Sequence, residues 1–205
     1  MSVKNLSLSQ FMNFSTKKSP SARLKAVKDA KYGDDYHPGR DYWKKLRDEI
    51  KRIHEKDLPI EDLKNILFDV PKDREANYRK NINSYISFVK KNNVTYFPVG
   101  KAIWTFDETI SVNANPELGL IINGVPHLVK NHYKKSDGSV SKQTIKTTLT
   151  AMQIATSEFV VPENAVYSVL NLQNKQLYSS QGIIDDDLML LQSEAIQLSY
   201  MWNNV

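Results

Sequence analysis

The sequence contains no cysteine among its 205 residues. Disulfide bonds, thiolate metal sites and cysteine nucleophiles are therefore excluded, as is typical of proteins kept in a reducing compartment. No stretch approaches the roughly 20 apolar residues of a membrane span, and the first residues, MSVKNLSLSQFMNF, lack the apolar run of a secretion signal. We therefore expect a cytoplasmic protein that is neither exported nor membrane-spanning.

The glycine-based motifs of several enzyme classes are also missing. Gly100 and Lys101 lack the upstream glycine and the following Ser or Thr of a phosphate-binding loop, and no G-x-G-x-x-G or G-x-S-x-G occurs. His127 and His132 are five residues apart, which places them on opposite faces of a regular strand, where they cannot bind one zinc ion. Nucleotide hydrolysis, serine-nucleophile chemistry and zinc binding therefore have no support.

Positive charge is concentrated in the first half of the chain, although the formal net charge is only +5. Residues 1–104 carry 22 basic and 13 acidic side chains, whereas residues 105–205 carry 6 and 10. The first half is therefore the better candidate for contact with an anionic partner such as nucleic acid. Lysine-rich helices that are simply solvated would give the same composition.

Apolar side chains in the first half recur at helical spacing. In GRDYWKKLRDEIKRIHEKD, apolar residues at steps of three and four predict a helix over 41–55, which Asp41 can cap. The segment PKDREANYRKNINSYISFVKKNN opens with proline and predicts a second helix over 73–91. We expect shorter helices over 7–14, 20–30 and 60–68.

From residue 94 short runs of aromatic and β-branched residues replace the helical pattern. TYFPVGKAIWTF, ETISVNA, PELGLIIN and VPHLVKNHY predict strands, most simply as a three-stranded meander. A helix after Ser141, a strand or hairpin over AVYSVLNLQNKQLYSS and a last helix from Asp185 follow. We expect an α+β protein in which a helical N-terminal region, 1–72, packs on a mixed sheet within a core over 73–205.

The stretch PELGLIINGVPHLVK predicts a β-hairpin with a two-residue turn at Asn123 and Gly124. In that register Glu117 lies opposite Lys130, and the two side chains share one face of the sheet. Gly119 lies opposite Leu128 on the same face, which leaves space for a substrate or for the approach of a neighbouring element.

This hairpin, with the helix before it and the helix and strand after it, resembles the PD-(D/E)xK, or restriction-endonuclease-like, superfamily over about residues 74–172. The common core of that superfamily has the order α-β-β-β-α-β, with an acidic residue on the second strand and an acid-x-lysine motif on the third. Pro116 and Glu117 are similar to the first motif, and Lys130 ends the stretch that replaces the second. The resemblance implies Glu117 and Lys130 as catalytic residues of a metal-dependent nuclease. NPELGLIINGVPHLVK is also similar to a pattern in uncharacterised bacterial proteins.

The departure from the superfamily pattern is that Leu128 occupies the position of the second metal-binding carboxylate. One carboxylate is a poor site for Mg²⁺ or Mn²⁺, so an active nuclease would need further oxygen ligands in addition to Glu117. Asp107, Glu108 or a carboxylate on the N-terminal helices could supply them. The alternative is that Glu117 and Lys130 form only a cross-strand ion pair. We therefore expect no cofactor unless the nuclease is active.

Basic and aromatic residues alternate in KYGDDYHPGRDYWKKLR. Tyr32, Tyr36 or an exposed Trp43 could stack on bases, although Trp43 also fits the core face of its helix. The neighbouring acidic residues offset part of the positive charge. The side chains that could hold phosphates are Arg40, Lys44, Lys45, Arg47 and Lys51.

Together these patterns indicate a nuclease-related, catalytically degenerate module that binds nucleic acid or acts within a larger assembly. A metal-dependent nuclease that uses Glu117 and Lys130 is the first alternative. The second is a protein-interaction subunit without nucleic acid. Such a subunit could form homo-oligomers through the broad apolar side of the last helix, MLLQSEAIQLSYMWNNV.

Overall fold

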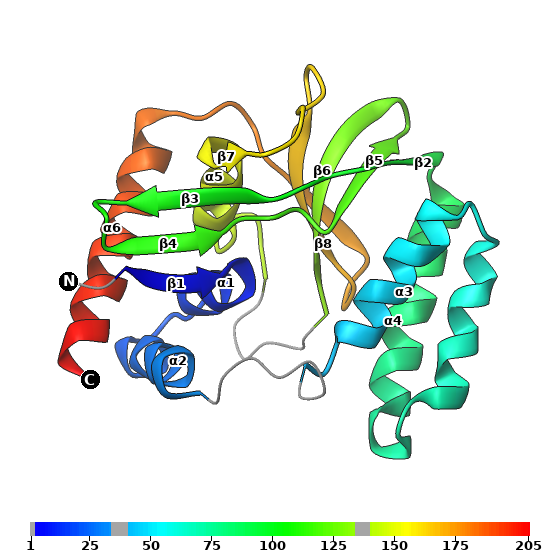
Figure 1. Ribbon diagram of the computed structural model, residues 1–205, viewed down its shortest axis with the longest axis horizontal. Coiled ribbons are helices and arrows are strands. Elements are labelled where there is room, and N and C mark those ends of the chain that lie inside the picture. The colour runs from blue at the N-terminus through cyan, green and yellow to red at the C-terminus, as the bar shows by residue number, and fades with distance from the viewer. Residues whose placement is uncertain (1–2, 34–40, 134–139) are drawn as a thin grey trace.

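The computed structural model describes residues 3–33, 41–133 and 140–205, which form a mixed α+β structure with two mixed sheets (Figure 1). The four-stranded sheet has the order β1 (Lys4–Ser7), β4 (Ile110–Asn113), β3 (Ala102–Phe106) and β7 (Thr156–Ser157). The five-stranded sheet has the order β2 (Val94–Phe97), β5 (Leu118–Ile122), β6 (Val125–His132), β8 (Val166–Asn171) and β9 (Gln176–Ser179).

The helices lie close to where apolar spacing predicts them. Ser7 begins the first one with a capping box, in which its Oγ accepts from the Gln10 N–H at 3.2 Å and Gln10 Oε1 accepts from the Ser7 N–H at 2.8 Å. In the described residues the α-helices are α1 (Leu8–Ser15), α2 (Pro20–Tyr32), α3 (Lys44–Glu55), α4 (Lys72–Lys91), α5 (Lys146–Ile154) and α6 (Asp185–Asn204). A 3₁₀ helix, η1 (Ile60–Asp69), joins α3 to α4. None of these helices has the length and apolarity needed to cross a membrane.

The elements divide into two halves (Figure 1). The five-stranded half consists of the five-stranded sheet with α3, η1 and α4, which share one apolar core. The four-stranded half consists of the four-stranded sheet with α1, α2 and α6, which share another. The expected helical region over 1–72 is therefore divided, since α1 and α2 pack with α6 while α3 and η1 pack with α4.

The expected three-stranded meander is not present. β3 and β4 form a hairpin whose turn residues Asp107 and Glu108 have φ of 44° and 52°, and β4 pairs in parallel with β1. The β3–β4 hairpin therefore belongs to the four-stranded sheet, and in the five-stranded sheet β2 pairs directly with β5. Strand β1 was not anticipated, and the partner it offers explains why β3 and β4 form a separate sheet.

The hairpin of β5 and β6 has the predicted register. Leu118 pairs with Val129, Gly119 with Leu128 and Ile122 with Val125, and Asn123 and Gly124 turn with φ of 51° and 88°. Helices cover both faces of this sheet, with α3, η1 and α4 on one side and α5 on the other. Both faces are therefore interior, whereas only the Leu118 face was predicted to be core.

Candidate functional site

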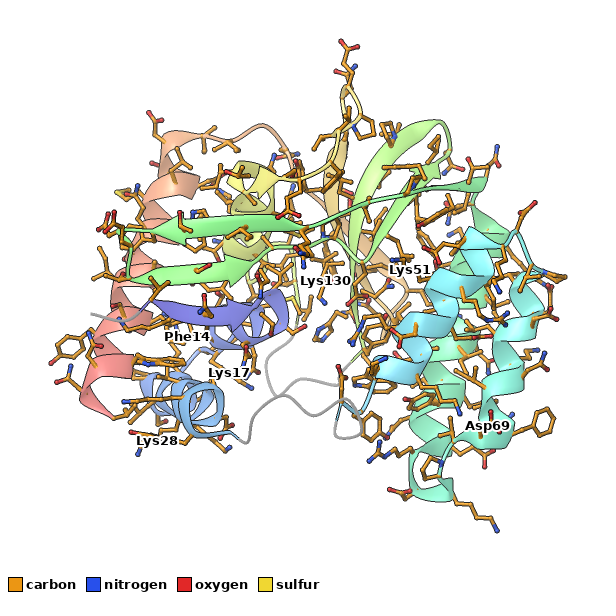
Figure 2. The ribbon with its side chains drawn as sticks, viewed as in Figure 1. Phe14, Lys17, Lys28, Lys51, Asp69 and Lys130 are labelled. Atoms are coloured by element: carbon orange, nitrogen blue, oxygen red, sulfur yellow. The ribbon has the colours of Figure 1, made fainter. Side chains whose placement is uncertain are left out.

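Glu117 and Lys130 form an ion pair between their Oε1 and Nζ atoms. Their side chains are only 8% and 9% exposed, so the pair is held out of water. In Figure 2 Lys130 lies near the middle of the molecule, between the two halves. The predicted proximity of acid and amine is correct, and burial makes it far more consequential than a surface ion pair.

Glu117 reaches this position because β5 begins one residue after it while β6 continues to His132. Its backbone N–H donates to Val129 O at 2.8 Å, which extends the ladder by one bond. Beyond that point no described strand pairs with β6 on this side. Instead, Glu117 Oε2 accepts from the Asn131 N–H at 3.4 Å and from Tyr133 Oη at 2.9 Å. The carboxylate therefore acts as a side-chain cap for the end of β6.

Residues at the start of α3 extend the cluster around Glu117. Trp43 stacks between Tyr78 and Tyr133, with ring centroids 5.2 and 5.5 Å apart. Arg47 donates to Asp41 at 2.7 Å. Burial opposes the charged form of Arg47, but the hydrogen bond to Asp41 and the negative charge of Glu117 outweigh it and raise the Arg47 pKa.

Burial and the Glu117 charge likewise raise the pKa of Tyr133 well above its ordinary value. Tyr133 is therefore a neutral donor to the carboxylate at physiological pH. The cationic Lys130 donates to Oε1 of Glu117, and the neutral Tyr133 hydroxyl and Asn131 N–H donate to Oε2. Both carboxylate oxygens therefore have partners within the protein.

The space over Gly119 is filled by a side chain of the neighbouring strand. A Cβ placed on Gly119 would lie 2.5 Å from the Phe97 ring and 2.6 Å from the Phe97 carbonyl oxygen. Phe97 is the strand partner of Gly119, while Leu128 on the other side is 1% exposed. Of the two uses expected for this space, the structure shows packing by a neighbour.

The predicted auxiliary ligands Asp107 and Glu108 lie at the far tip of the β3–β4 hairpin. At the other end of this hairpin the Ala102 N–H donates to Asn115 Oδ1 at 2.6 Å, close in sequence to Glu117. Because a strand rises about 3.3 Å per residue, the tip lies on the order of 13 Å from Ala102, at the opposite end of the hairpin from Asn115. In the part of the chain that the structure describes, no three His, Asp or Glu side chains gather as a metal site.

Three of the residues predicted to bind phosphates lie next to acidic side chains of the protein itself. Lys44 pairs with Asp48, Lys51 Nζ lies 3.5 Å from Glu55, and Arg47 is directed to Asp41. Arg40 lies outside the described residues, as does Tyr36. Trp43 is buried and not exposed for base stacking, and the Tyr32 hydroxyl donates to Val205 O at 2.6 Å.

A pocket of about 440 Å³ lies between α3 and the start of α4. Its basic lining residues are Lys44, Lys45, Arg52 and Arg74. Arg74 was not predicted from the sequence. Its guanidinium lies 4.8 Å from the centre of the Tyr42 ring, and it has no ion pair with any described residue. The 32-residue separation of Tyr42 and Arg74 explains why no local pattern reveals their contact.

Acidic side chains also line this pocket and offset part of its charge. Lys45 lies 3.3 Å from Asp69, and Arg52 donates to Glu49 at 2.6 and 2.8 Å. The acidic residues of the lining itself are Asp41, Asp48 and Glu49. Arg74 is therefore the basic side chain of this pocket with the least local compensation.

The buried His127 and the half-buried His54 both have partners within the protein. His127 Nδ1 lies 2.8 Å from Ser168 Oγ, but Ser168 is fully buried and cannot meet a substrate as a nucleophile. His54 Nε2 lies 2.7 Å from the Tyr85 hydroxyl. Burial lowers the pKa of both imidazoles, so they are neutral at physiological pH.

Comparison of the chain with protein-family models and with curated proteins finds no match.

Proposed function

We propose that this chain is a nuclease-related module that has lost phosphodiester cleavage and works by binding nucleic acid. The observation that supports the loss of cleavage is that the Glu117 carboxylate is fully occupied by hydrogen bonds from the protein. Its two oxygens are taken by Lys130, Tyr133 and the Asn131 N–H, and a leucine and a phenylalanine fill the neighbouring space. A metal nuclease needs at least two converging carboxylates and room for a water molecule.

The relationship to the restriction-endonuclease-like core is supported by element order. α4, β2, β5, β6, α5 and β8 follow one another in the sequence, and β8 pairs in parallel with β6 next to the hairpin that bears Glu117 and Lys130. On this proposal the β3–β4 hairpin is an insertion between the first and second core strands. The Pro116-Glu117 pair then begins the second strand, and Lys130 lies on the third.

Nucleic-acid binding is supported by the basic first half and by the pocket between α3 and α4. On this proposal Arg74 and Lys45, which both line the pocket, contact phosphates, and the Tyr42 ring packs against the Arg74 guanidinium. Phosphate contacts of this kind give binding without sequence preference.

The test is fluorescence anisotropy with labelled single- and double-stranded oligonucleotides at increasing salt. We expect affinity that falls steeply with salt and is reduced at least tenfold in Lys45→Glu/Arg74→Glu. The matched control is Lys17→Glu/Lys28→Glu, which changes the net charge equally near α2, away from the pocket (Figure 2). Equal losses in both variants, or no binding by the unaltered chain, would overturn the proposal.

A parallel assay addresses cleavage. We expect no nicking of DNA or RNA with Mg²⁺ or Mn²⁺. Metal-dependent cutting that disappears in Lys130→Ala, while the variant remains folded, would instead establish the nuclease alternative.

A further inference from the structure

The outward face of α6 exposes apolar side chains. Met189, Ile196 and Tyr200 are 61%, 58% and 70% exposed. Steps of seven and four residues return to the same side of a helix, so these side chains form one stripe. The opposite face of α6, with Leu191, Ala195 and Leu198, is buried in the four-stranded half. α6 is thus apolar on its outer as well as its inner side.

This outer face also lacks charge. From Leu188 to Val205 the single charged residue is Glu194, which is partly buried and lies 3.4 Å from Arg23. The polar residues beside the stripe are the neutral Gln192, Ser193 and Asn203. A solvated helix normally carries charges on its outer face, and depletion of charge around exposed apolar side chains is typical of the centre of a protein interface.

The two ends of α6 differ in charge. Asp185 and Asp186 are exposed at its start. At its end, Lys31 of α2 donates from Nζ to Trp202 O at 2.8 Å and to Val205 O at 2.7 Å. The helix therefore presents an acidic start, a neutral apolar middle and an end at which the Lys31 ammonium of α2 lies beside the last carbonyl groups.

We propose that α6 is the interface of a homodimer in which two copies of the helix pack antiparallel. In this arrangement the acidic end of each copy lies beside the Lys31 end of the other, and Met189 lies opposite Tyr200 of the second copy. A parallel pair would bring the two acidic ends together and repel. The same stripe is used by both copies, as a two-fold interface requires.

The dimer leaves the α3–α4 pocket free. α6 lies at one side of the molecule and α3 and α4 lie at the opposite side (Figure 1). Two copies joined through α6 therefore present two pockets at opposite ends, so a polyanion that spans both would bind with increased apparent affinity. The dimer itself does not depend on the proposed nucleic-acid binding.

The first test is sedimentation velocity across a range of concentrations. We expect a dimer whose dissociation constant rises at least 100-fold in Ile196→Lys, because the substitution places a charge at the centre of the stripe. Phe68→Lys is the matched control, since Phe68 is 90% exposed at the end of η1, and it should leave the dimer unchanged. Circular dichroism verifies that both variants fold, as expected for exposed positions.

Three outcomes of this test would overturn the dimer. One is a chain that stays monomeric at every concentration. The others are a dimer that Ile196→Lys leaves intact, and a dimer that Phe68→Lys weakens as much.

The second test fixes the orientation by cross-linking, which the absence of cysteine makes unambiguous. With a rise of 1.5 Å per residue and a two-fold axis midway between Met189 and Tyr200, two copies of position 193 lie about 5 Å apart along the helix, and two copies of position 203 about 25 Å apart. A short bismaleimide should therefore link Ser193→Cys and not Asn203→Cys. Efficient linkage of Asn203→Cys would show a parallel pair and contradict the proposal.

Discussion

The two halves of the molecule differ in their most conspicuous feature, which is a buried ion pair in one and an exposed apolar helix face in the other. The five-stranded half places an ion pair, His127 and Tyr133 in its interior and gives them partners. The four-stranded half has an interior of mainly apolar side chains and leaves an apolar stripe on the outer face of α6. In the five-stranded half the buried Glu117 and Lys130 have partners, although the buried Asn131 Oδ1 has none among the described residues. In the four-stranded half a stripe of apolar side chains on α6 is left in contact with water.

This difference shows where binding should be sought. Burying a polar group is costly unless it is hydrogen-bonded, and around Glu117 the protein supplies those bonds from its own side chains. Both oxygens of Glu117 are therefore hydrogen-bonded by the protein itself. An exposed apolar stripe is stabilised when a partner covers it, so α6 is the surface whose environment a partner would change most.

The largest expected effect is at the buried ion pair. Glu117→Ala leaves the Lys130 ammonium buried without its partner, and we expect a loss of about 3–5 kcal/mol in the free energy of unfolding measured with urea. Arg23→Ala in the four-stranded half removes an ion pair whose side chains are 23% and 16% exposed, and it should cost less. Equal losses in the two variants would remove the contrast between the halves.

A double replacement sharpens the same comparison. Glu117→Leu/Lys130→Met removes both charges and retains side-chain volume, and we expect it to be much less destabilising than Glu117→Ala. If the double variant is as unstable as the single one, packing and the hydrogen bonds to Tyr133 account for the loss, and the isolated Lys130 charge does not.

A smaller effect is expected at the glycine under Phe97. Gly119→Ala would bring a Cβ against both the Phe97 ring and its carbonyl oxygen, and we expect a loss of about 1–3 kcal/mol. Gly182, in the connection before α6, has open space around its Cβ position, so Gly182→Ala should be neutral or slightly stabilising. Thermal unfolding of both variants measures the difference. An unaffected Gly119→Ala would mean that the space over the hairpin is open after all.

The smallest effect is a pH dependence of opposite sign in the two halves. Burial lowers the pKa of His54 and His127, so below about pH 6.5 the unfolded chain binds more protons than the five-stranded half, which loses stability as the pH falls. Burial raises the pKa of Glu194, so its contribution to the four-stranded half is largest at low pH and is lost as the pH rises through that raised value.

Hydrogen exchange measured by mass spectrometry at pH 7.5 and 5.5, corrected for intrinsic rates, separates these contributions. Protection of β6 should decrease on acidification, while protection of α6 should be maintained or increase. His54→Gln/His127→Gln should reduce the change in β6, and Glu194→Gln should reduce that in α6. Equal changes in both halves would contradict the assignment.

Local patterns were sufficient for the hairpin and for the helices. The Asn123-Gly124 turn fixes the register that places Glu117 beside Lys130, because a two-residue turn leaves a single pairing that keeps one face apolar. Arg47 shows the limit, since helical spacing places it in a basic stripe beside Lys44 and Lys51. Its contact with Asp41 and the nearby charge of Glu117 direct it inward, and Glu117 is 70 residues away.

The sequence by itself determined the helices, the hairpin register, the absence of thiol chemistry and the presence of Leu128, not an acid, two residues before Lys130. These depend on side-chain periodicity, turn conformation and residue type, which act within a few neighbouring residues. The tertiary structure alone decided that β3 and β4 pair with β1 and that Phe97 fills the space over Gly119. It also decided that Tyr133 donates a hydrogen bond to Glu117 and that one face of α6 is left exposed. These outcomes depend on which distant segments compete for the same strand edge or the same apolar surface, and that competition is resolved only when the whole chain packs.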